Sequence, residues 1–475
     1  MAAKTTLNAK NLEALGAERL SELLIEISMG SAANKRRLRL ELAGAQSTAE
    51  VAREVRKRLS SIDRSRTLID WRKIKALKSD LETQRAVIAG TIAEDDPDEA
   101  MALLWRFLEL AVSIFARCDD GNGLIMESFH AVCLDLGAVA VKATKDKRLA
   151  EQVFAAIQRN DYGECDPLVP ALASALGKDG LARLKALLVG WAKEPVEDPA
   201  DRVAIGWSAN GPIYADEIYG RHRETAIRIA LEQIADAEGD VDAFIAQQSA
   251  PARAVPAIAA DIAGRLLTAG RAKEALAALD KAEPTGRPAL DFAWQQARVE
   301  VLDALGRQTE AQAFRWQCFE RELSVDHLKA FIKRLPDFDD MEAEEKAFAY
   351  AHSVEDVHLA LTFFSSWLAL AEAARLVLTR ADEIDGDLYE VLTPAAAWLQ
   401  ERHPLAATIL LRAMIDFALG RARTGRYRHA ARHLNACAML AKHITDFGGI
   451  PDHATYAAGL RRSHGKKHGF WSAVA

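Results

Sequence analysis

A short phrase that occurs three times constrains this chain more than any other feature of its sequence. It begins with Gly-Arg and has Ala four residues after the Arg, at Gly270–Ala275, Gly306–Ala311 and Gly425–Ala430. In the first two copies, apolar residues at helical spacing precede and follow the glycine. Glycine ends the first helix because it adopts the left-handed conformation without a Cβ clash, and the small alanine lets a second helix pack closely. The phrase therefore predicts a helix-turn-helix unit.

The spacing of the phrase predicts the architecture of the second half of the chain. The first two copies begin 36 residues apart, close to the ~34-residue period of tetratricopeptide-type repeats. We therefore expect residues 221–475 to form an α-solenoid of tetratricopeptide-like hairpins. A repeat scaffold carries no chemistry of its own, so this prediction concerns architecture and not activity. Degenerate copies without Gly-Arg fall at about repeat spacing at Glu342-Ala343, Glu372-Ala373 and Leu405-Ala406.

The composition predicts an all-α protein with an interruption near its middle. Ala, Leu, Glu and Arg dominate, and long runs of alternating β-branched residues are missing. We expect an N-terminal helical domain at 1–194, a linker at 195–220 and the α-solenoid at 221–475. Prolines open the linker, and Asn210-Gly211-Pro212 lies between apolar flanks. That pattern predicts a short irregular or hairpin joint near 203–218.

The cysteines favour a reducing compartment, and we expect a cytoplasmic protein. Their number is five, they are scattered, and no C-x-x-C is present, so neither a disulfide framework nor a zinc ribbon is expected. Residues 1–16 show no pattern of a secretory signal. Apolar runs are broken by charge well before ~18 residues, so no membrane span is expected.

A basic block lies between Lys35 and Lys78, within a chain of net charge −7. It contains 14 Lys and Arg against 5 Asp and Glu, a net of +9, which leaves about −16 for the remainder. The block could bind nucleic acid, dock on an acidic region such as Asp337–Glu345, or form a solvated helix face. Trp71 is its one aromatic residue, and no recognised nucleic-acid motif is visible. The candidate anion-binding residues are Lys35, Arg36, Arg37, Arg53, Arg56, Lys57, Arg58, Arg72 and Lys73.

The joint carries the candidate partner-binding residues. Trp207 and Tyr214 are bulky for a loop, and Asp216 and Glu217 offer carboxylates. These side chains bind a partner, or else they seal the joint and cap the next helix. His222 follows closely, and a carboxylate–imidazole pair does acid–base chemistry if a pocket brings the two together. Because no hydrolase elbow, phosphate loop or dinucleotide fingerprint is present, we expect no catalytic residue and no cofactor.

A weak metal candidate lies near the C-terminus. His429, His433 and Cys437 are spaced four residues apart and share one helical face, where two histidines could hold zinc. No fourth ligand is evident, and the same segment carries Tyr427 and Leu434, which are ordinary packing residues. A packing face is the alternative interpretation.

Two segments of the tail resemble a known family. Residues 402–415 and 427–434 are similar to the helical-repeat tails of bacterial SWIM-type zinc-finger proteins, over about 255–465. As a whole, the chain resembles a cytosolic bacterial family of unknown function that shares this tail. The resemblance implies an α-solenoid. The zinc finger itself, a C-x-C…C-x-H arrangement, is absent, so no metal or nucleic-acid role is transferred.

These observations favour a non-catalytic helical-repeat scaffold. Stacked hairpins present an extended concave surface that suits a protein or peptide partner. Two alternatives stay open: a nucleic-acid-associated protein that uses the basic helices, and an enzyme with a site near residues 205–222.

Overall fold

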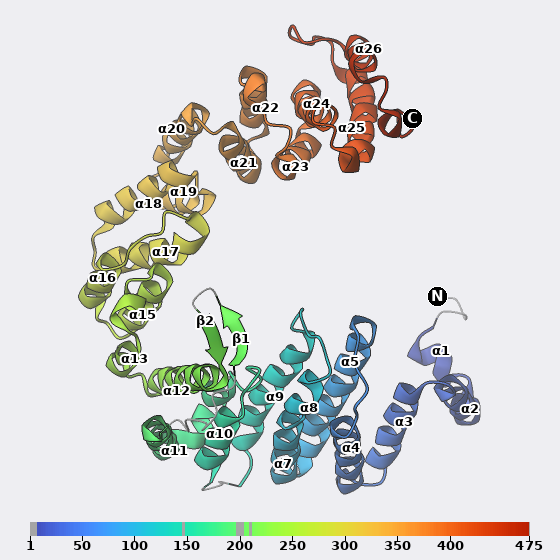
Figure 1. Cartoon of the computed structure of the whole chain (residues 1–475), viewed down its shortest axis with the longest axis vertical. Helices are drawn as coiled ribbons and strands as arrows, with labels where there is room; N and C mark the ends of the chain where they lie inside the picture. The colour runs from blue at the N-terminus through green and yellow to red at the C-terminus, as the bar shows by residue number, and fades with distance from the viewer. Residues whose placement is uncertain (1–6, 145–147, 196–203, 209–210, 475) are drawn as a thin grey trace. The chain divides into compact units, whose positions relative to one another are not determined.

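The computed structural model describes residues 7–144, 148–195, 204–208 and 211–474, with backbone alone at 204–208, 211–221 and 288–289. Helices dominate this part of the chain, and its strands form a single two-stranded hairpin, so the all-α expectation is confirmed (Figure 1). The chain divides into two compact units, Met1–Ser249 and Ala250–Ala475. The division falls later than the linker that the sequence suggests, because α12 (Ala215–Glu238) packs along α11 (Leu168–Lys193) within the first unit.

The N-terminal unit is built from helices that mostly pack on their neighbours in sequence. Its elements are α1 (Ala9–Glu13), α2 (Gly16–Ser28), α3 (Ala32–Gly44), α4 (Thr48–Asp63), α5 (Trp71–Val87), the π-helical turn η1 (Ile88–Ile92), α6 (Ala93–Asp95), α7 (Pro97–Leu108), α8 (Leu110–Phe115), α9 (Leu124–Ala140), α10 (Leu149–Gln158), α11, β1 (Ala204–Ser208), β2 (Gly211–Tyr214), α12 and α13 (Val241–Gln247).

Helix α9 lies at the centre of this unit and contacts α5, α7 and α11. Phe129 of α9 meets Phe107 of α7 edge to face, with ring centroids 5.6 Å apart. Further along its length, α9 approaches α11 so closely that a Cβ at Gly137 would lie 2.2 Å from the carbonyl oxygen of Ala171. Glycine at this position is therefore a condition of the packing between the two helices.

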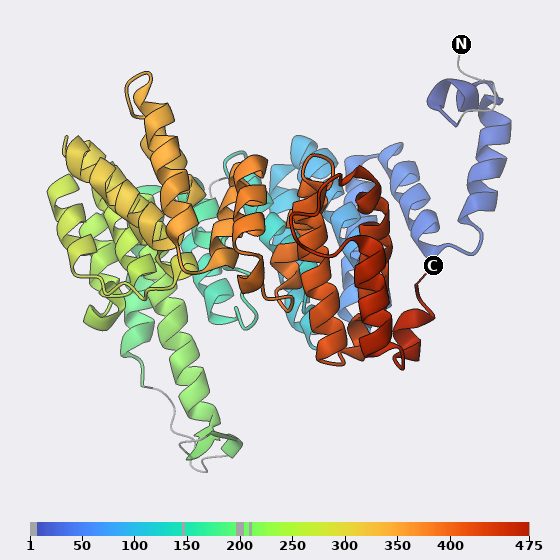
Figure 2. The same ribbon diagram turned by 90° about the horizontal axis from the view of Figure 1, so that it is seen from above.

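The joint is a hairpin, as the sequence suggested. Strands β1 and β2 pair antiparallel, with Trp207 opposite Pro212 and Ser208 opposite Gly211. Figure 2 shows the hairpin at the N-terminal end of α12. Residues 203, 209 and 210 of the expected joint lie outside the described residues.

The C-terminal unit is entirely helical in its described residues. Its elements are α14 (Ala250–Arg253), α15 (Pro256–Thr268), α16 (Ala272–Asp280), α17 (Pro288–Ala304), α18 (Gln308–Glu322), α19 (Val325–Ile332), α20 (Asp339–Ser353), α21 (Val357–Trp367), α22 (Leu370–Thr379), η2 (Ala381–Glu383), α23 (Tyr389–Leu399), α24 (Pro404–Gly420), η3 (Thr424–Arg426), α25 (Tyr427–Leu440), η4 (Ala441–His443), α26 (His453–His464) and α27 (His468–Trp471).

The first two Gly-Arg phrases form the turns that the sequence predicts. Gly270 and Gly306 adopt φ values of 75° and 71°, and they connect the packed pairs α15–α16 and α17–α18. Ala275 and Ala311 are fully buried where the paired helices meet. The third phrase differs, since Gly425 lies within the 3₁₀ turn η3 and Ala422 takes the left-handed conformation, with φ 51°.

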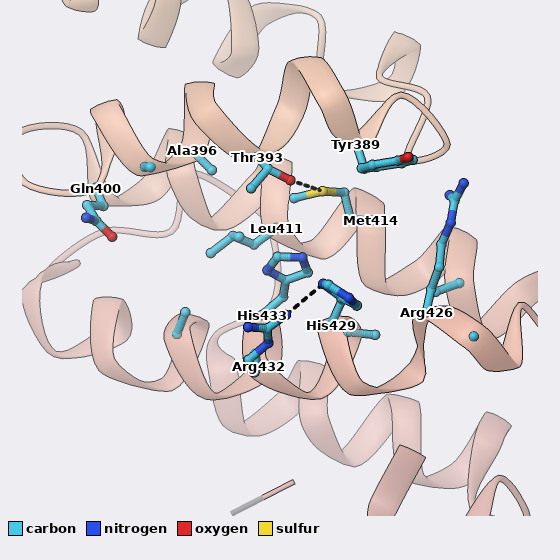
Figure 3. A pocket seen from close by; sticks show the side chains of 16 residues that line it. Tyr389, Thr393, Ala396, Gln400, Leu411, Met414, Arg426, His429, Arg432 and His433 are labelled. Carbon is cyan, nitrogen blue, oxygen red and sulfur yellow. Dashed lines mark hydrogen bonds between the residues drawn. The ribbon is translucent and has the colours of Figure 1, made fainter. Parts of the chain in front are cut away.

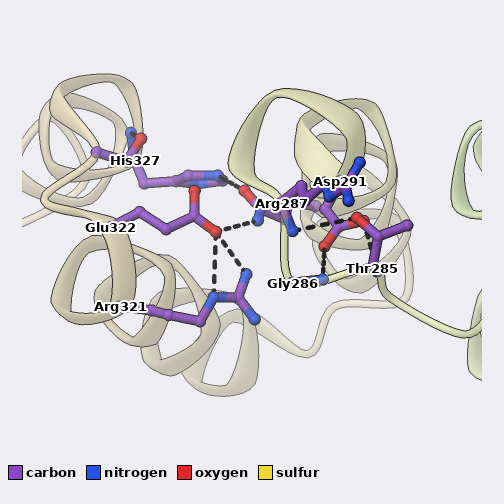
Figure 4. A network of polar contacts seen from close by, with 9 residues as sticks. Thr285, Gly286, Arg287, Asp291, Arg321, Glu322 and His327 are labelled. Carbon is purple, nitrogen blue, oxygen red and sulfur yellow. Dashed lines mark hydrogen bonds and ion pairs between the residues drawn. The ribbon is translucent and has the colours of Figure 1, made fainter.

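A buried polar network joins α17 to α18 and α19 (Figure 4). The amide of Gln295 donates to Glu322 at 2.9 Å, and its oxygen lies 2.9 Å from Nε2 of His327. Asp291 accepts hydrogen bonds from the backbone N–H groups of Thr285 and Gly286. Burial raises the pKa of Asp291, but the hydrogen bonds from Thr285 and Gly286 outweigh it and leave that pKa lowered. The network fixes the turn before α17 and the position of α19 against it.

The close approach of α9 to α11 gives a stability prediction. Gly137→Ala should lower the free energy of unfolding of the N-terminal unit by about 1–3 kcal/mol, because the new methyl group must push two backbones apart. Urea unfolding followed by circular dichroism measures the change. The matched control is Gly190→Ala in α11, where a Cβ meets nothing within 4 Å. It should be neutral or stabilise by up to about 1 kcal/mol. Equal effects of both changes would contradict the packing described.

Candidate functional site

A cavity of about 680 Å³ lies in the C-terminal unit between α23, α24 and α25 (Figure 3). We call it the α23–α25 groove. Its volume is within the range of pockets that hold small ligands or a few residues of a peptide. Helix α24 contributes Leu411, Met414 and Ala418 to its lining.

Small side chains create the space of the groove. Ala396 and Ala397 line it from α23, and Ala430 and Ala436 line it from α25. Leucine or phenylalanine at these positions would fill the gap, since cores otherwise pack without voids. The result is a largely apolar channel with polar groups at its edges.

Basic side chains and imidazoles edge the groove on the α25 side. The groove is lined by Arg426, His429, Arg432 and His433, and no carboxylate of the described residues lines it. Nη2 of Arg432 lies 2.8 Å from Nδ1 of His429, which accepts a hydrogen bond from it. Arg432 is exposed, and within the described part of the chain it forms no ion pair with a carboxylate. The edge therefore offers a cation whose charge is not neutralised by the protein.

Arg426 is held in place, in contrast to Arg432. Its Nη1 donates to Oδ1 of Asp387 at 2.7 Å, and its guanidinium lies 4.6 Å from the centroid of the Tyr389 ring. The turn that carries Asp387 reaches α24 because a glycine precedes it. A Cβ at Gly386 would lie 2.0 Å from the carbonyl oxygen of Ala413. Gly386 thus fixes the position of the groove's rigid corner.

His433 projects into the groove beside His429 (Figure 3). Burial lowers the pKa of His433 to about 4, and the nearby His429 and Arg432 act in the same direction. Its imidazole is therefore neutral at pH 7, where it can accept or donate one hydrogen bond. An anion placed between His433 and Arg432 would favour the protonated form.

His429, His433 and Cys437, the candidate metal ligands, do not come together as a metal site in the described structure. Cys437 is fully buried in the hydrophobic core with Leu434, and burial raises the pKa of its thiol to about 12. A zinc ligand must be a thiolate. Among the residues with described side chains, no group of three His, Cys, Asp or Glu is placed to hold a metal ion. The geometry favours the packing interpretation for Cys437, and it leaves His429 and His433 to the groove.

Most of the candidate anion-binding residues of the basic block have a carboxylate neighbour. Six of the nine candidates form ion pairs, and their carboxylate partners all lie within the N-terminal unit. Exposed ion pairs contribute little stability, but they neutralise charge. Lys35, Arg37 and Arg72 form no ion pair with the residues described, and Arg72 lies 5.1 Å from the Trp71 ring. The ion pairs are Arg36–Asp80, Arg58–Asp80, Arg53–Glu50, Arg56–Glu99, Lys57–Glu54 and Lys73–Asp70.

The candidates at the joint are only partly described. The side chains of Trp207, Tyr214, Asp216 and Glu217 lie outside the described residues, although their backbones belong to β1, β2 and α12. His222 is exposed and lines a second cavity, of about 310 Å³, in the N-terminal unit. Asp161 and Tyr162 line the same cavity.

Sequence patterns identify only part of the groove lining. They single out His429 and His433, but not Tyr389, Arg426 or Arg432. The available signal was the alanine run 395–397, since consecutive small side chains on a helix indicate a close approach or an unfilled space.

A family of unknown function, DUF6880, matches residues 2–473. The chain belongs to this family. The DUF6880 match covers both units and confirms the expected membership of a family of unknown function, whereas the resemblance of the tail to SWIM-type proteins stays a prediction. No curated protein matches this DUF6880 chain. Within its described residues, none of the helices has the length and apolar character needed to cross a membrane.

The lowered pKa of His433 predicts a pH-dependent stability. As the pH falls from about 6.5 to about 4, the unfolded chain binds a proton at this residue before the folded chain does. The C-terminal unit should therefore lose stability across that window, and His433→Gln should lose less. Thermal unfolding at pH 7 and at pH 5 measures the difference. His443→Gln, at an exposed histidine of η4, is the control and should keep the wild-type dependence. Identical pH dependence in wild type and His433→Gln would contradict this account.

Proposed function

We propose that the chain is a non-catalytic helical-repeat protein, whose C-terminal unit binds a peptide segment of a protein partner in the α23–α25 groove. The observation that carries the proposal is the lining of the groove, which combines an apolar channel with Arg432, a cation without an ion pair, and with no carboxylate among the described residues that line it. The paired helices α15–α16 and α17–α18, with their Gly-Arg turns, support a tetratricopeptide-like arrangement. The free cysteines support a cytoplasmic location.

The chemistry of the groove favours a peptide that carries both an apolar and an acidic side chain. An apolar side chain would lie against Leu411 and Met414, which are largely removed from water. A carboxylate would lie at the α25 edge and accept hydrogen bonds from Arg432. Hydrogen bonds between guanidinium and carboxylate are about twice as strong as neutral ones, so this contact would select acidic segments.

The surroundings of the imidazoles favour binding over catalysis. A histidine that acts as a general base is normally oriented by a hydrogen-bonded carboxylate or similar group. His433 instead faces His429 and Arg432, whose proximity lowers its basicity. The ion pairs of the basic block make nucleic-acid association the weaker candidate, since they neutralise six of its nine candidate anion-binding residues.

Peptide libraries test this proposal directly. Two sets of acetylated and amidated heptapeptides share a central Leu and differ in having Glu or Gln among the flanking residues. The wild-type protein should retain the Glu set preferentially. Arg432→Gln should weaken that binding by about tenfold or more, as expected for a hydrogen bond between charged groups. Ala397→Trp should abolish binding of both sets, because Ala397 is exposed and its replacement fills the channel without disturbing the core.

The control for the charge is Arg428→Gln, since Arg428 is exposed on the same helix but does not line the groove. Fluorescence anisotropy gives the affinities. Equal retention of both sets, or no effect of Ala397→Trp, would refute peptide binding at this groove.

A further inference from the structure

The last part of the chain carries an unbalanced positive charge. Between Asp416 and Asp446, and again after Asp452, the sequence contains ten Lys and Arg and no Asp or Glu. The rest of the chain has 51 basic against 68 acidic residues, a net of −17, which with these ten gives the −7 of the whole chain. Neighbours in sequence therefore do not neutralise the ten cations.

Two turns bring five of these cations to one end of the C-terminal unit, which we call the basic end. The first turn connects α24 to α25, and the second connects α26 to α27. Nζ of Lys467, in the second turn, donates to the carbonyl oxygen of Leu419, two residues before Arg421 of the first turn. The two turns are therefore in contact. The cations of the basic end are Arg421, Arg423, Arg461, Lys466 and Lys467.

The short helix α27 is anchored, and it keeps the second turn in place. Phe470 is fully buried, and its ring centroid lies 6.4 Å from that of Tyr427 at the start of α25. Nε1 of Trp471 donates to the carbonyl oxygen of His464 at 2.9 Å, and the guanidinium of Arg461 lies 4.6 Å from the Trp471 ring. The basic end is thus a preorganised surface, which lowers the entropic cost of binding.

The positive charge of the basic end is largely uncompensated. Within the described residues, none of its five cations forms an ion pair with a carboxylate. Helices α24 and α26 end at this surface, and each helix C-terminus is equivalent to about half a negative charge, so together they offset about one of the five positive charges. This surface is separate from the basic block of the N-terminal unit, in which six of nine candidates are ion-paired.

The chemistry of the basic end favours a backbone of phosphates over an apolar partner. A protein interface has an apolar centre. Among the described residues of 415–474, Met439 is the large apolar residue that is mostly exposed, and it lies near the opposite end of α25. Single-stranded nucleic acid binds by stacking its bases on aromatic rings. The Trp471 ring is instead contacted by Arg461 and by Phe470, whose ring centroid is 4.8 Å away.

We propose that the basic end binds the phosphate backbone of a double-stranded nucleic acid without reading its sequence. Guanidinium and ammonium groups make the contacts to phosphate that position a protein on a duplex, and these contacts carry no sequence information. The site is distinct from the α23–α25 groove, because none of the five cations lines that groove. DNA and RNA duplexes share this backbone chemistry, and the experiment distinguishes them.

The salt dependence of duplex binding tests the proposal. The full-length chain is titrated into a fluorescein-labelled DNA duplex of about 20 base pairs, and fluorescence anisotropy gives the association constant between about 50 and 200 mM KCl. Contacts with three to five phosphates predict a slope of about −3 to −5 in the plot of log K against log salt. A duplex of scrambled sequence should bind equally. An RNA duplex is the second arm, and the tighter ligand identifies the source of the backbone.

Two double variants test whether the two turns act as one surface. Arg421→Gln with Arg423→Gln changes the first turn, and Arg461→Gln with Lys466→Gln changes the second. Each should reduce the steepness of the slope by about one to two, since about 0.9 is lost with each phosphate contact. Circular dichroism should show an unchanged fold.

The matched control is Arg402→Gln with Lys442→Gln. Both residues are exposed and lie at the opposite ends of α24 and α25, so the control removes the same charge from the same unit. It should keep the wild-type slope. No binding of either duplex, an equal loss in the control, or tighter binding of polyglutamate or of phosphatidylserine vesicles than of both duplexes would overturn the proposal. Ala397→Trp should bind the duplex as the wild type does, so failure here is distinguishable from failure of the peptide groove.

Discussion

The burial of α24 is the interaction on which the candidate site depends. This helix packs on α23 and on α25, and ten of its seventeen residues are buried. Arg412 is among them, and it donates to the carbonyl oxygen of Pro451 at 2.7 Å while lying over the ring of Tyr456. Tyr456 in turn donates to Asp416 at 2.7 Å, and burial raises the pKa of that carboxyl. Polar contacts on one side of α24 thus hold the segment that follows α25, while the opposite side is left to the groove.

The groove combines a rigid corner with an adaptable edge. Gly386 allows the turn before α23 to lie in close contact with α24. In this position Asp387 forms an ion pair with Arg426, and the ring of Tyr389 lies against its guanidinium. In the described part of the chain, Arg432 has one side-chain partner, His429, whose Nδ1 accepts a hydrogen bond that is weaker than an ion pair with a carboxylate. A ligand would therefore meet a preorganised wall at one end and a side chain free to adjust at the other. Such a division lowers the entropic cost of binding without fixing a single sequence of peptide.

Local features of the fold could be predicted from the sequence, but the groove could not. Gly270 and Gly306 determine their turns through their own backbone freedom, and the hairpin forms where Gly211 and Pro212 interrupt the helical pattern. Gly425 repeats the phrase without its conformation, because residues 424–426 form a 3₁₀ turn and Ala422 takes the left-handed role. The periodicity of His429 and His433 placed them on one face. That face lies opposite Tyr389 of α23 and Leu411 of α24. No pattern in the sequence shows that these two helices pack beside α25.

For binding, the positions of the charged side chains in this chain matter more than the net charge. The +9 of the basic block suggested a surface for an anionic partner, yet Asp80 alone neutralises parts of α3 and α4 through Arg36 and Arg58. The same reasoning applies in reverse to the groove, which carries basic groups in a chain of net charge −7. The net charge would repel an acidic segment at long range, but at physiological ionic strength that field is screened within about 8 Å. Direct contacts with Arg432 act inside this distance. An acidic ligand would thus be selected by contact and not by steering, so its affinity would depend on how well its carboxylate fits the α25 edge.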